Sequence, residues 1–407
     1  MTLLTYHSLI VVVLDAVVSI VLWVVTSFYI AGNMYWVYQL LAGVVTYTSP
    51  APLHGGYAVE VRIVTIGNES AVTETVRNLP PELDRRYVIS EEPIEVPGAE
   101  VLVVPDEFES KAVNKGRALE WARQAVPCQR EYVLYLDEDS HMDGFSGLPD
   151  SDIVQFTEQP RRTTSLLAHL CEINRMGFQI EQRGFQSATV PLYTWGGGVA
   201  IRSSIEDAVT WDYSTLIEDT VFTWRAFVEL PEQPSFSVLS ETISGQSPPS
   251  LFDMIRQRRR WISGSRENNT ILSLDRVIMY GLRDLSWSVT AAVPLFLFLG
   301  NLPGVDVFAW QIHQGISVVL LSFVFVWVGI GIWQVRPTPA IAGLSLVLAP
   351  VTSVLHSVGA LWGLVSPPDS FDVTTKADEV TNQPPQHYRT TTDEHPPRHH
   401  YRDANDD

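Results

Sequence analysis

Lysine is nearly absent from this chain of 407 residues. Lys111, Lys115 and Lys376 are the only lysines, and acidic residues outnumber basic ones by 46 to 27, for a formal net charge of -19. A broad nucleic-acid-binding surface needs an excess of basic residues, so the composition argues against one. Strong acidity with little lysine is typical of adaptation to high salt, where screening weakens repulsion between like charges. An ordinary acidic protein with a charged tail is the alternative.

Cysteine is also scarce. Cys128 and Cys171 are too few for a disulfide framework or a cysteine-based metal site. We expect both to be small buried thiols, which suits a reduced, cytoplasmic setting.

The N-terminal region lacks basic residues and is strongly apolar. The run from Ser8 to Ile30 is interrupted only by Asp15 and approaches the ~20 residues that cross a bilayer. Without a basic leader or a small-residue cleavage site, it predicts a retained anchor. The short apolar stretch from Met34 to Thr48 extends the anchor, lies in the interface, or returns as a hairpin. Three more apolar runs follow the middle of the chain: 285–302, 315–335 and 340–365.

The distribution of arginine predicts an orientation. Most arginines lie in the middle of the chain, and the loop between the last two apolar runs carries Arg336. For about four spans, the positive-inside rule places the middle domain in the cytoplasm of a multi-pass cell-membrane protein, with both termini outside. The termini are reassigned if 34–48 crosses or if 285–302 lies on the membrane surface.

Residues 51–265 alternate strand-like and helical patterns, which predicts an α/β domain between a membrane anchor (1–50) and C-terminal membrane segments (266–366). From 367 to 407 the chain is acidic and poor in apolar residues, so we expect a disordered tail whose His395, His399 and His400 are solvated. The clearest strands are expected at 61–66, 87–90, 101–104 and 132–136, and helices at 70–78 and 115–125.

The sharpest local feature is the strand that begins at Tyr132 and runs into Asp137, Glu138 and Asp139. Because side chains alternate along a strand, both aspartates project to one side and Glu138 to the other. Two adjacent carboxylates at a strand's carboxyl end suit a hard divalent cation that also bridges phosphate oxygens, and ligands of open α/β sheets bind at this edge. A solvated acidic turn is the alternative.

Two further motifs follow. Trp195 precedes three glycines, Gly196 to Gly198, where the backbone can approach a ligand and the indole can face a sugar ring. A glycine turn with a packed tryptophan is the alternative. Glu218 and Asp219 then open a helical pattern, where Asp219 could serve as a general base or both acids could simply cap the helix.

The last motif is an amphipathic helix within residues 247–264. Gln257, Arg260 and Trp261 share one of its faces, whereas Arg256 and Arg259 lie away from it. A basic run next to a membrane segment usually contacts lipid headgroups, which would account for most of these arginines. It would not explain a glutamine and a tryptophan in register with Arg260.

In chain order these motifs resemble those of family 2 glycosyltransferases with a GT-A fold, which carry DxD, glycine-rich, ED and QxxRW motifs. The resemblance covers roughly residues 57–265, and the apolar segments beyond it resemble those of cellulose- and hyaluronan-synthase relatives. Residues 136–140 and 247–264 are also similar to egghead-type β-1,4-mannosyltransferases, which use GDP-mannose. The resemblance implies an α/β fold with a Rossmann-like mixed sheet and about four transmembrane helices.

The resemblance also implies roles for matching residues. Asp139 would be the main ligand of Mg²⁺ or Mn²⁺, and Asp137 would contact the metal or the donor's ribose. Asp219, beside Glu218, would deprotonate the acceptor hydroxyl for an inverting displacement, while metal and Arg260 stabilise the leaving diphosphate. The other expected contacts are Thr65, Glu91 and Lys115 on the donor side, and Trp195, Gly197, Gln257, Arg260 and Trp261 on the acceptor or diphosphate side.

Two departures from the family pattern leave the nucleotide open. The turn at 64–69 lacks a frequent proline, and Glu91 and Glu92 stand where aspartates are usual. We therefore expect a hexosyltransferase that uses GDP-mannose or a UDP-sugar and a lipid-linked or glycan acceptor, in contact with membrane lipids. A processive polysaccharide synthase and a non-catalytic nucleotide-sugar-binding scaffold are the rivals. A transporter is disfavoured because Asp15 and His356 are the only ionisable residues in the expected spans.

Overall fold

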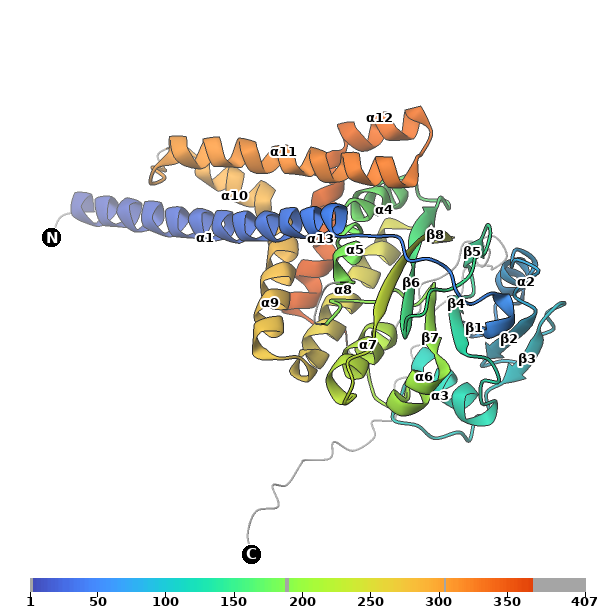
Figure 1. Cartoon of the computed structure of the whole chain (residues 1–407). Helices are drawn as coiled ribbons and strands as arrows, with labels where there is room; N and C mark the ends of the chain where they lie inside the picture. Colours follow the sequence, from blue (N-terminus) through green and yellow to red (C-terminus); the bar gives the residue numbers. More distant parts are fainter. Residues whose placement is uncertain (1–2, 187–189, 304, 369–407) are drawn as a thin grey trace, which may run out of the picture.

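In a computed structural model of the chain, which describes residues 3–186, 190–303 and 305–368, one eight-stranded mixed sheet forms the centre of an α/β body (Figure 1). The strand order is β3-β2-β1-β4-β7-β6-β8-β5. The strands are β1 (Val59–Thr65), β2 (Arg85–Ser90), β3 (Glu100–Val103), β4 (Tyr132–Asp137), β5 (His141–Met142), β6 (Ile153–Arg161), β7 (Val199–Arg202) and β8 (Phe236–Gln246).

The first four strands agree with the sequence prediction to within two residues at each end. They form the parallel half of the sheet, in which β1 pairs with both β2 and β4. Every residue of β1 is buried, which is why apolar runs identify such strands. The other half contains β7, antiparallel to β4 and β6, and the long strands β6 and β8, which the sequence did not predict.

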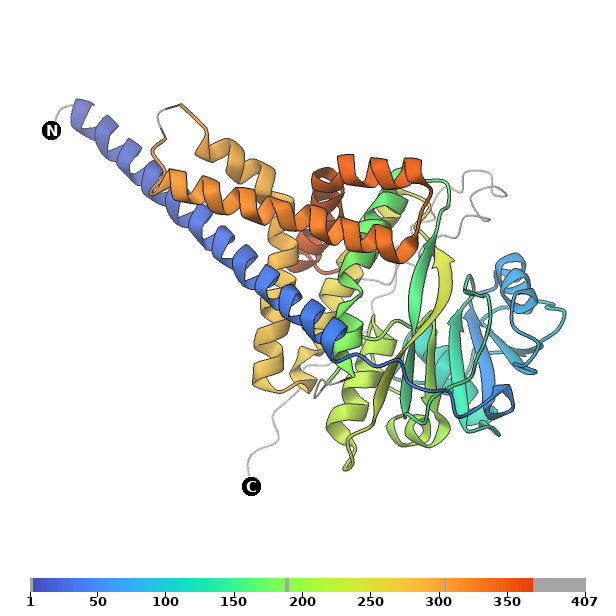
Figure 2. The same cartoon turned by 45° about the horizontal axis from the view of Figure 1, so that its top comes forward.

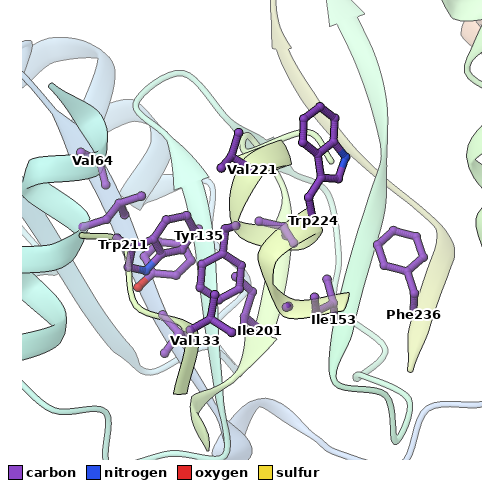
Figure 3. Packing of buried hydrophobic residues seen from close by; sticks show 14 of the residues in the cluster. Val64, Val133, Tyr135, Ile153, Ile201, Trp211, Val221, Trp224 and Phe236 are labelled. Atoms are coloured by element: carbon purple, nitrogen blue, oxygen red, sulfur yellow. The ribbon is translucent and has the colours of Figure 1, made fainter. Parts of the chain in front are cut away.

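The two faces of the sheet carry separate hydrophobic cores. Leu134 and Leu136 of β4 face the core under α2 (Glu69–Arg77). Val133 and Tyr135 face the other core, with residues of α3 (Lys115–Ala125) and α7 (Glu218–Glu229) and with Trp211 after α6 (Ser203–Val209) (Figure 3). Asp137 continues the Val133–Tyr135 side of the strand, so it projects toward the face that α3 and α7 cover.

The apolar N-terminus is a single long helix, α1 (Leu3–Val45), which extends away from the α/β body (Figures 1 and 2). The runs at 8–30 and 34–48 therefore belong to one helix, and the hairpin alternative is wrong. Residues 10–45 of α1 and all of α11 (Trp310–Val335) are long and apolar enough to cross a membrane.

The predicted number of about four spans is higher than the described residues support. The run at 285–302 is divided among three elements: α9 (Leu274–Val289), the 3-10 helix η3 (Thr290–Ala292) and α10 (Val293–Gly300). Pro294 lies at the start of α10, where the regular helix is interrupted. The run at 340–365 is α12 (Pro339–Val347) and α13 (Ala349–Val365), bent by 74° where Pro350 opens the second helix. Two helices qualify, or three if this bent pair is one span.

These helices pack closely on the α/β body. A Cβ on Gly177 of α4 (Leu166–Phe178) would overlap the backbone of Trp327 in α11, and one on Gly331 would overlap that of Ile173. Likewise Gly359 of α13 lies against α8 (Leu251–Asn268). Helix α1 in turn contacts α9 and α5 (Glu181–Phe185). Helices of the segment 266–366 therefore pack directly against helices α4 and α8 of the segment that precedes it.

Residues 369–407 of the predicted disordered tail, including His395, His399 and His400, lie outside the described residues.

Candidate active site

The acidic motif ends β4 in a tight turn. Ser140 donates its backbone N–H to the carbonyl of Asp137 at 3.1 Å, and Glu138 accepts a hydrogen bond from the Thr65 hydroxyl. A Cβ on Gly197 would lie 3.0 Å from Asp137 Oδ2, and one on Gly245 would lie 3.8 Å from Asp139 Oδ2. Both glycines also lie against the Trp195 indole, so both aspartates lie near that ring, whereas Glu138 bonds to Thr65. Because β4 ends at Asp137, the turn and not strand alternation sets the directions of Glu138 and Asp139.

Asp139 is held by the end of β8. It is buried, and its Oδ2 accepts a hydrogen bond of 2.6 Å from the backbone N–H of Gln246. Its own carbonyl accepts from Arg161 of β6 at 2.8 Å. The last residue of β8 thus holds the carboxylate and Arg161 of β6 holds the backbone of Asp139, although both strands lie far from it in sequence.

Lys115, the first residue of α3, lies among three carboxylates. Its Nζ is 2.9 Å from Asp137 Oδ1, 3.5 Å from Asp219 Oδ1 and 3.7 Å from Glu218 Oε1. Burial alone would lower the pKa of Lys115, but these carboxylates more than offset it and hold the pKa well above its usual value. The ammonium group therefore stays charged and joins the first turns of α3 and α7 to the end of β4.

Asp219 occupies the first turn of α7 and has a raised pKa. Burial raises that pKa to about 7, with further contributions from Glu218 and Asp137, while Lys115 opposes the shift. Asp219 Oδ1 is buried, and the Lys115 ammonium group lies 3.5 Å from it. A carboxylate whose pKa lies near neutrality is suited to accept a proton at physiological pH.

The three glycines provide space for these side chains. A Cβ on Gly196 would overlap the Asp219 carboxylate, one on Gly197 would overlap the Trp195 indole, and one on Gly198 would lie 2.8 Å from Ile243 Cδ1. None of the three has a positive φ angle. The segment therefore needs glycine for close approach and not for an unusual backbone conformation.

A cavity of about 270 Å³ opens from Asp219 toward the apolar helices α1 and α11. Trp195, Arg260 and Trp261, three of the residues expected on the acceptor or diphosphate side, line it. Arg260 lies near the carboxylates that surround Lys115. Burial lowers the pKa of Arg260, and the negative charges of Glu218, Asp137 and Asp219 oppose that shift. Trp261 lies between two guanidinium groups, with Arg258 at 4.1 Å and Arg175 at 5.4 Å from its ring.

The remaining residues of the QxxRW helix have structural contacts. Gln257 does not line the cavity, and its Oε1 accepts from Arg258 at 2.6 Å. Arg258 is fully buried and pairs with Glu172. Arg259 and Arg266 donate to the carbonyls of Ser366 and Leu364 at 2.9 and 2.6 Å, the C-terminal end of α13. The predicted lipid-headgroup role is thus wrong for Arg258, which is buried. Arg259 and Arg266 instead cap the C-terminal end of α13.

The expected donor-side residues Thr65 and Glu91 lie at the carboxyl ends of β1 and β2. The Thr65 hydroxyl accepts from the N–H groups of Gly67 and Asn68, both at 3.1 Å, so it shapes the turn that follows the strand. Glu91 pairs with Arg117 at 2.8 Å. Both side chains are therefore already bonded within the protein, and they preorganise this edge of the sheet.

The carboxylates at the end of β4 fit a divalent cation. Asp137 and Asp139 offer hard oxygen ligands, and a small cation such as Mg²⁺ commonly takes one or two carboxylates together with substrate phosphates. Glu218 and Asp219 add two carboxylates to this cluster, against the single ammonium group of Lys115. A triad of His54, Glu131 and Asp150 also lies within metal-ligand distances, but Arg202 pairs with two of its members, which makes it an ion-pair cluster.

Sequence reasoning missed several residues of this site. The cavity residues Tyr280 and Arg283 of α9 were not predicted, and Lys115, expected on the donor side, was not predicted to lie among three carboxylates. Both residues lie in α9, just before the apolar run at 285–302, and no motif in the sequence marks them. Their place in the cavity wall follows from the packing of α9.

Comparison with known proteins agrees with this architecture. The family model described as glycosyl transferase family group 2 matches residues 132–352, more than half of the chain. A β-1,4-mannosyltransferase, egh, of Drosophila melanogaster is 23% identical over 316 residues; the match covers 68% of this chain and 66% of the relative, just under two thirds of its length.

Among solved structures, a mannosyltransferase from Pyrobaculum calidifontis in complex with GDP-Man and Mn²⁺ has a similar fold. The TM-score is 0.54 at 13% identity, and the match covers 82% of this chain and 99% of that one. The mixed α/β sheet and the likeness to this structure fit a GT-A fold.

Proposed function

The chain belongs to glycosyl transferase family group 2, and from this premise we propose that it is a membrane-bound inverting hexosyltransferase. It transfers a hexose from a nucleotide-sugar to a lipid-linked or glycan acceptor. The observation that carries the proposal is the cluster of Asp137, Glu218 and Asp219 around Lys115, at the mouth of a cavity that leads to the apolar helices.

The donor occupies the carboxyl edge of β1, β2 and β4. Thr65 and Glu91 shape the nucleoside end, and Lys115 lies where donor phosphates would approach Asp137. Asp137 and Asp139 are the residues that would hold Mg²⁺ or Mn²⁺, which neutralises negative charge on the leaving diphosphate when bound. The likeness to a protein bound to GDP-Man and Mn²⁺ and to a β-1,4-mannosyltransferase supports GDP-mannose as the first donor to test.

Asp219 is the base. Its carboxylate faces the cavity, takes the proton of the acceptor hydroxyl, and so lets the oxygen attack the anomeric carbon from the side opposite the diphosphate. Glu218 and Lys115 hold it in place through the ion-pair cluster. Arg260, near the same carboxylates, contributes positive charge on the leaving-group side. One displacement inverts the anomeric configuration.

Membrane association follows from α1 and α11. Both helices line the cavity with some residues and expose apolar side chains elsewhere, which suits a bilayer. We place the α/β body on the cytoplasmic side of a multi-pass protein, by the positive-inside rule. The cavity volume lies near the lower limit of the ~300–1,000 Å³ of small-molecule sites, which favours a single transfer over extrusion of a polymer.

The test uses the full chain in lipid nanodiscs. GDP- and UDP-sugars are screened for hydrolysis and transfer with Mg²⁺ or Mn²⁺. Asp219→Asn is expected to lower transfer by about 10²-fold or more while donor binding persists. Asp139→Ala is expected to weaken metal-dependent donor binding.

Asp207→Asn, at an exposed acid of α6, is the matched control and should leave both unchanged. Normal turnover by Asp219→Asn would refute the base assignment. Long polymer in place of a single added hexose would instead establish the processive alternative.

A further inference from the structure

Gln155 places a polar side chain in the middle of a buried strand. It belongs to β6, which lies between β7 and β8 in the sheet, and it is fully buried. Its neighbours Val154 and Phe156 are also fully buried and belong to one hydrophobic core. Burying an amide group is unfavourable unless its donors and acceptor are paired, so the partners of Gln155 explain why a glutamine occupies this position.

Those partners lie in the irregular segment 194–198, which precedes β7. Gln155 Oε1 accepts a hydrogen bond from the backbone N–H of Trp195 at 2.8 Å. Its Nε2 donates to the carbonyls of Trp195 and Gly198 at 3.1 and 2.7 Å. The amide thus pairs with both backbone polar groups of Trp195, as a neighbouring strand would do for a residue within a sheet.

Other side chains hold the same segment from the elements that carry the acidic motifs. Ser140 Oγ accepts the backbone N–H of Asp137 at 3.1 Å and donates to the carbonyl of Gly197 at 2.9 Å. The Thr220 hydroxyl, in the first turn of α7, lies 3.2 Å from both the backbone nitrogen and the carbonyl oxygen of Thr194. The segment therefore connects the end of β4 to the first turn of α7, and the amide from β6 holds its middle.

The segment 194–198 contacts carboxylates of both acidic motifs. A Cβ on Gly196 would overlap the Asp219 carboxylate, and one on Gly197 would lie 3.0 Å from Asp137 Oδ2. A shift of this backbone therefore changes the space around both carboxylates together. A misplacement of ~1 Å in a reacting group can cost about 10²-fold in rate, so the position of the segment matters for the chemistry.

We propose that Gln155 is a positioning residue of the transfer reaction. Its amide fixes the segment 194–198, and the segment sets the separation between Asp219 on the acceptor side and Asp137 on the donor side. Because Gln155 is buried, it acts through these groups and not on a substrate directly. The inference rests on the proposed glycosyl transfer, from which the two aspartates take their roles.

Gln155→Met keeps the length of the side chain and removes its hydrogen bonds. The full chain in nanodiscs is assayed for hydrolysis of GDP-mannose, and of UDP-glucose as a second donor probe, with Mn²⁺ and with water in place of the acceptor hydroxyl. We expect kcat to fall by about 10²-fold, whereas the KM for the donor changes by less than about threefold.

Gln159→Met is the matched control. Gln159 lies in the same strand, and its Nε2 also donates to a backbone carbonyl, that of Val335 in α11 at 3.1 Å. This contact does not involve the segment 194–198, so the variant should keep the kcat of the wild type.

A double-mutant cycle distinguishes positioning from a general loss of structure. If Gln155 acts through the base, Gln155→Met should lower the residual rate of Asp219→Asn by less than about threefold, because only losses from independent causes multiply. Hydrogen exchange in peptides that contain 194–198 should also be faster in Gln155→Met. If Gln155→Met does not fold, Ser140→Ala, which frees the carbonyl of Gly197, replaces it in the same cycle.

The inference is overturned by a normal kcat in folded Gln155→Met, by a rate loss that multiplies with that of Asp219→Asn, or by unchanged hydrogen exchange in the segment. Absence of donor hydrolysis by the wild type would instead refute the proposed function. The wild-type assay therefore separates the two failures.

Discussion

Gly196 lies so close to Asp219 that a Cβ carbon on the glycine would overlap the carboxylate. The glycine-rich segment and the proposed base are 23 positions apart in sequence, yet they form one surface of the site. The segment does not need glycine for backbone freedom, because its φ angles are ordinary. It needs glycine because the proposed base occupies the space of a side chain.

Gly196→Ala should therefore impair catalysis more than folding. The added methyl group displaces Asp219, and a misplacement of ~1 Å in a reacting group can cost about 10²-fold in rate. We expect kcat to fall by that order while donor affinity changes little. Gly144→Ala, at a glycine with open space around it, is the control. Unchanged kcat in Gly196→Ala would show that Asp219 can relocate without consequence.

Lys115→Met should change the response of the protein to divalent cations. The ammonium group of Lys115 lies among three carboxylates, so its removal leaves their repulsion uncompensated and lowers Tm in EDTA. The same removal eliminates a positive charge that repels a cation near Asp137, so Mn²⁺ binding without nucleotide should tighten by on the order of tenfold. Calorimetric titration with Mn²⁺ measures this, with Lys111→Met as the exposed control. Equal or weaker Mn²⁺ affinity in Lys115→Met would contradict the expected competition.

Gly331→Ala should separate the apolar helix α11 from α4. A Cβ at this position overlaps the carbonyl of Ile173, and overpacking typically costs 1–3 kcal/mol. Gly329→Ala, two residues earlier in the same helix, meets nothing within 4 Å and should be neutral or slightly stabilising. Tm measured in nanodiscs compares the two variants. A similar Tm for both would show that the α4–α11 contact adapts without cost.

His169 of α4 should make stability depend on pH. Burial lowers its pKa, Arg162 adds to that shift and Glu172 opposes it, while Nδ1 lies 2.9 Å from Ser247 Oγ. The fold favours the neutral imidazole, so this stabilisation is complete above the unfolded pKa of ~6.5 and is lost as pH falls below it toward the depressed folded value. The Tm of the wild type should therefore decrease more between pH 7.5 and pH 5.5 than that of His169→Asn. Equal decreases would assign the pH dependence to other groups.

Local patterns were sufficient for the parallel half of the sheet and for the order of the motifs. Strand β4 and helix α3 were predicted to within a residue, because fully buried parallel strands are continuous apolar runs and an amphipathic helix repeats its pattern. Alternation along the strand was expected to set the directions of Asp137, Glu138 and Asp139, but β4 ends at Asp137 and a turn holds the other two.

Tertiary structure decided what depends on contacts between distant segments. Hydropathy does not distinguish an unbroken helix from one that is divided near Pro294 or bent at Pro350, so the number of candidate spans followed only from the structure. Arg259 and Lys115 were visible as charges, but their partners come from α13 and from the first turn of α7. The acidic pair at the end of β4 was thus evident from sequence, whereas the lysine among the carboxylates and the cavity beyond them arise from the packing of α3, α7 and α9.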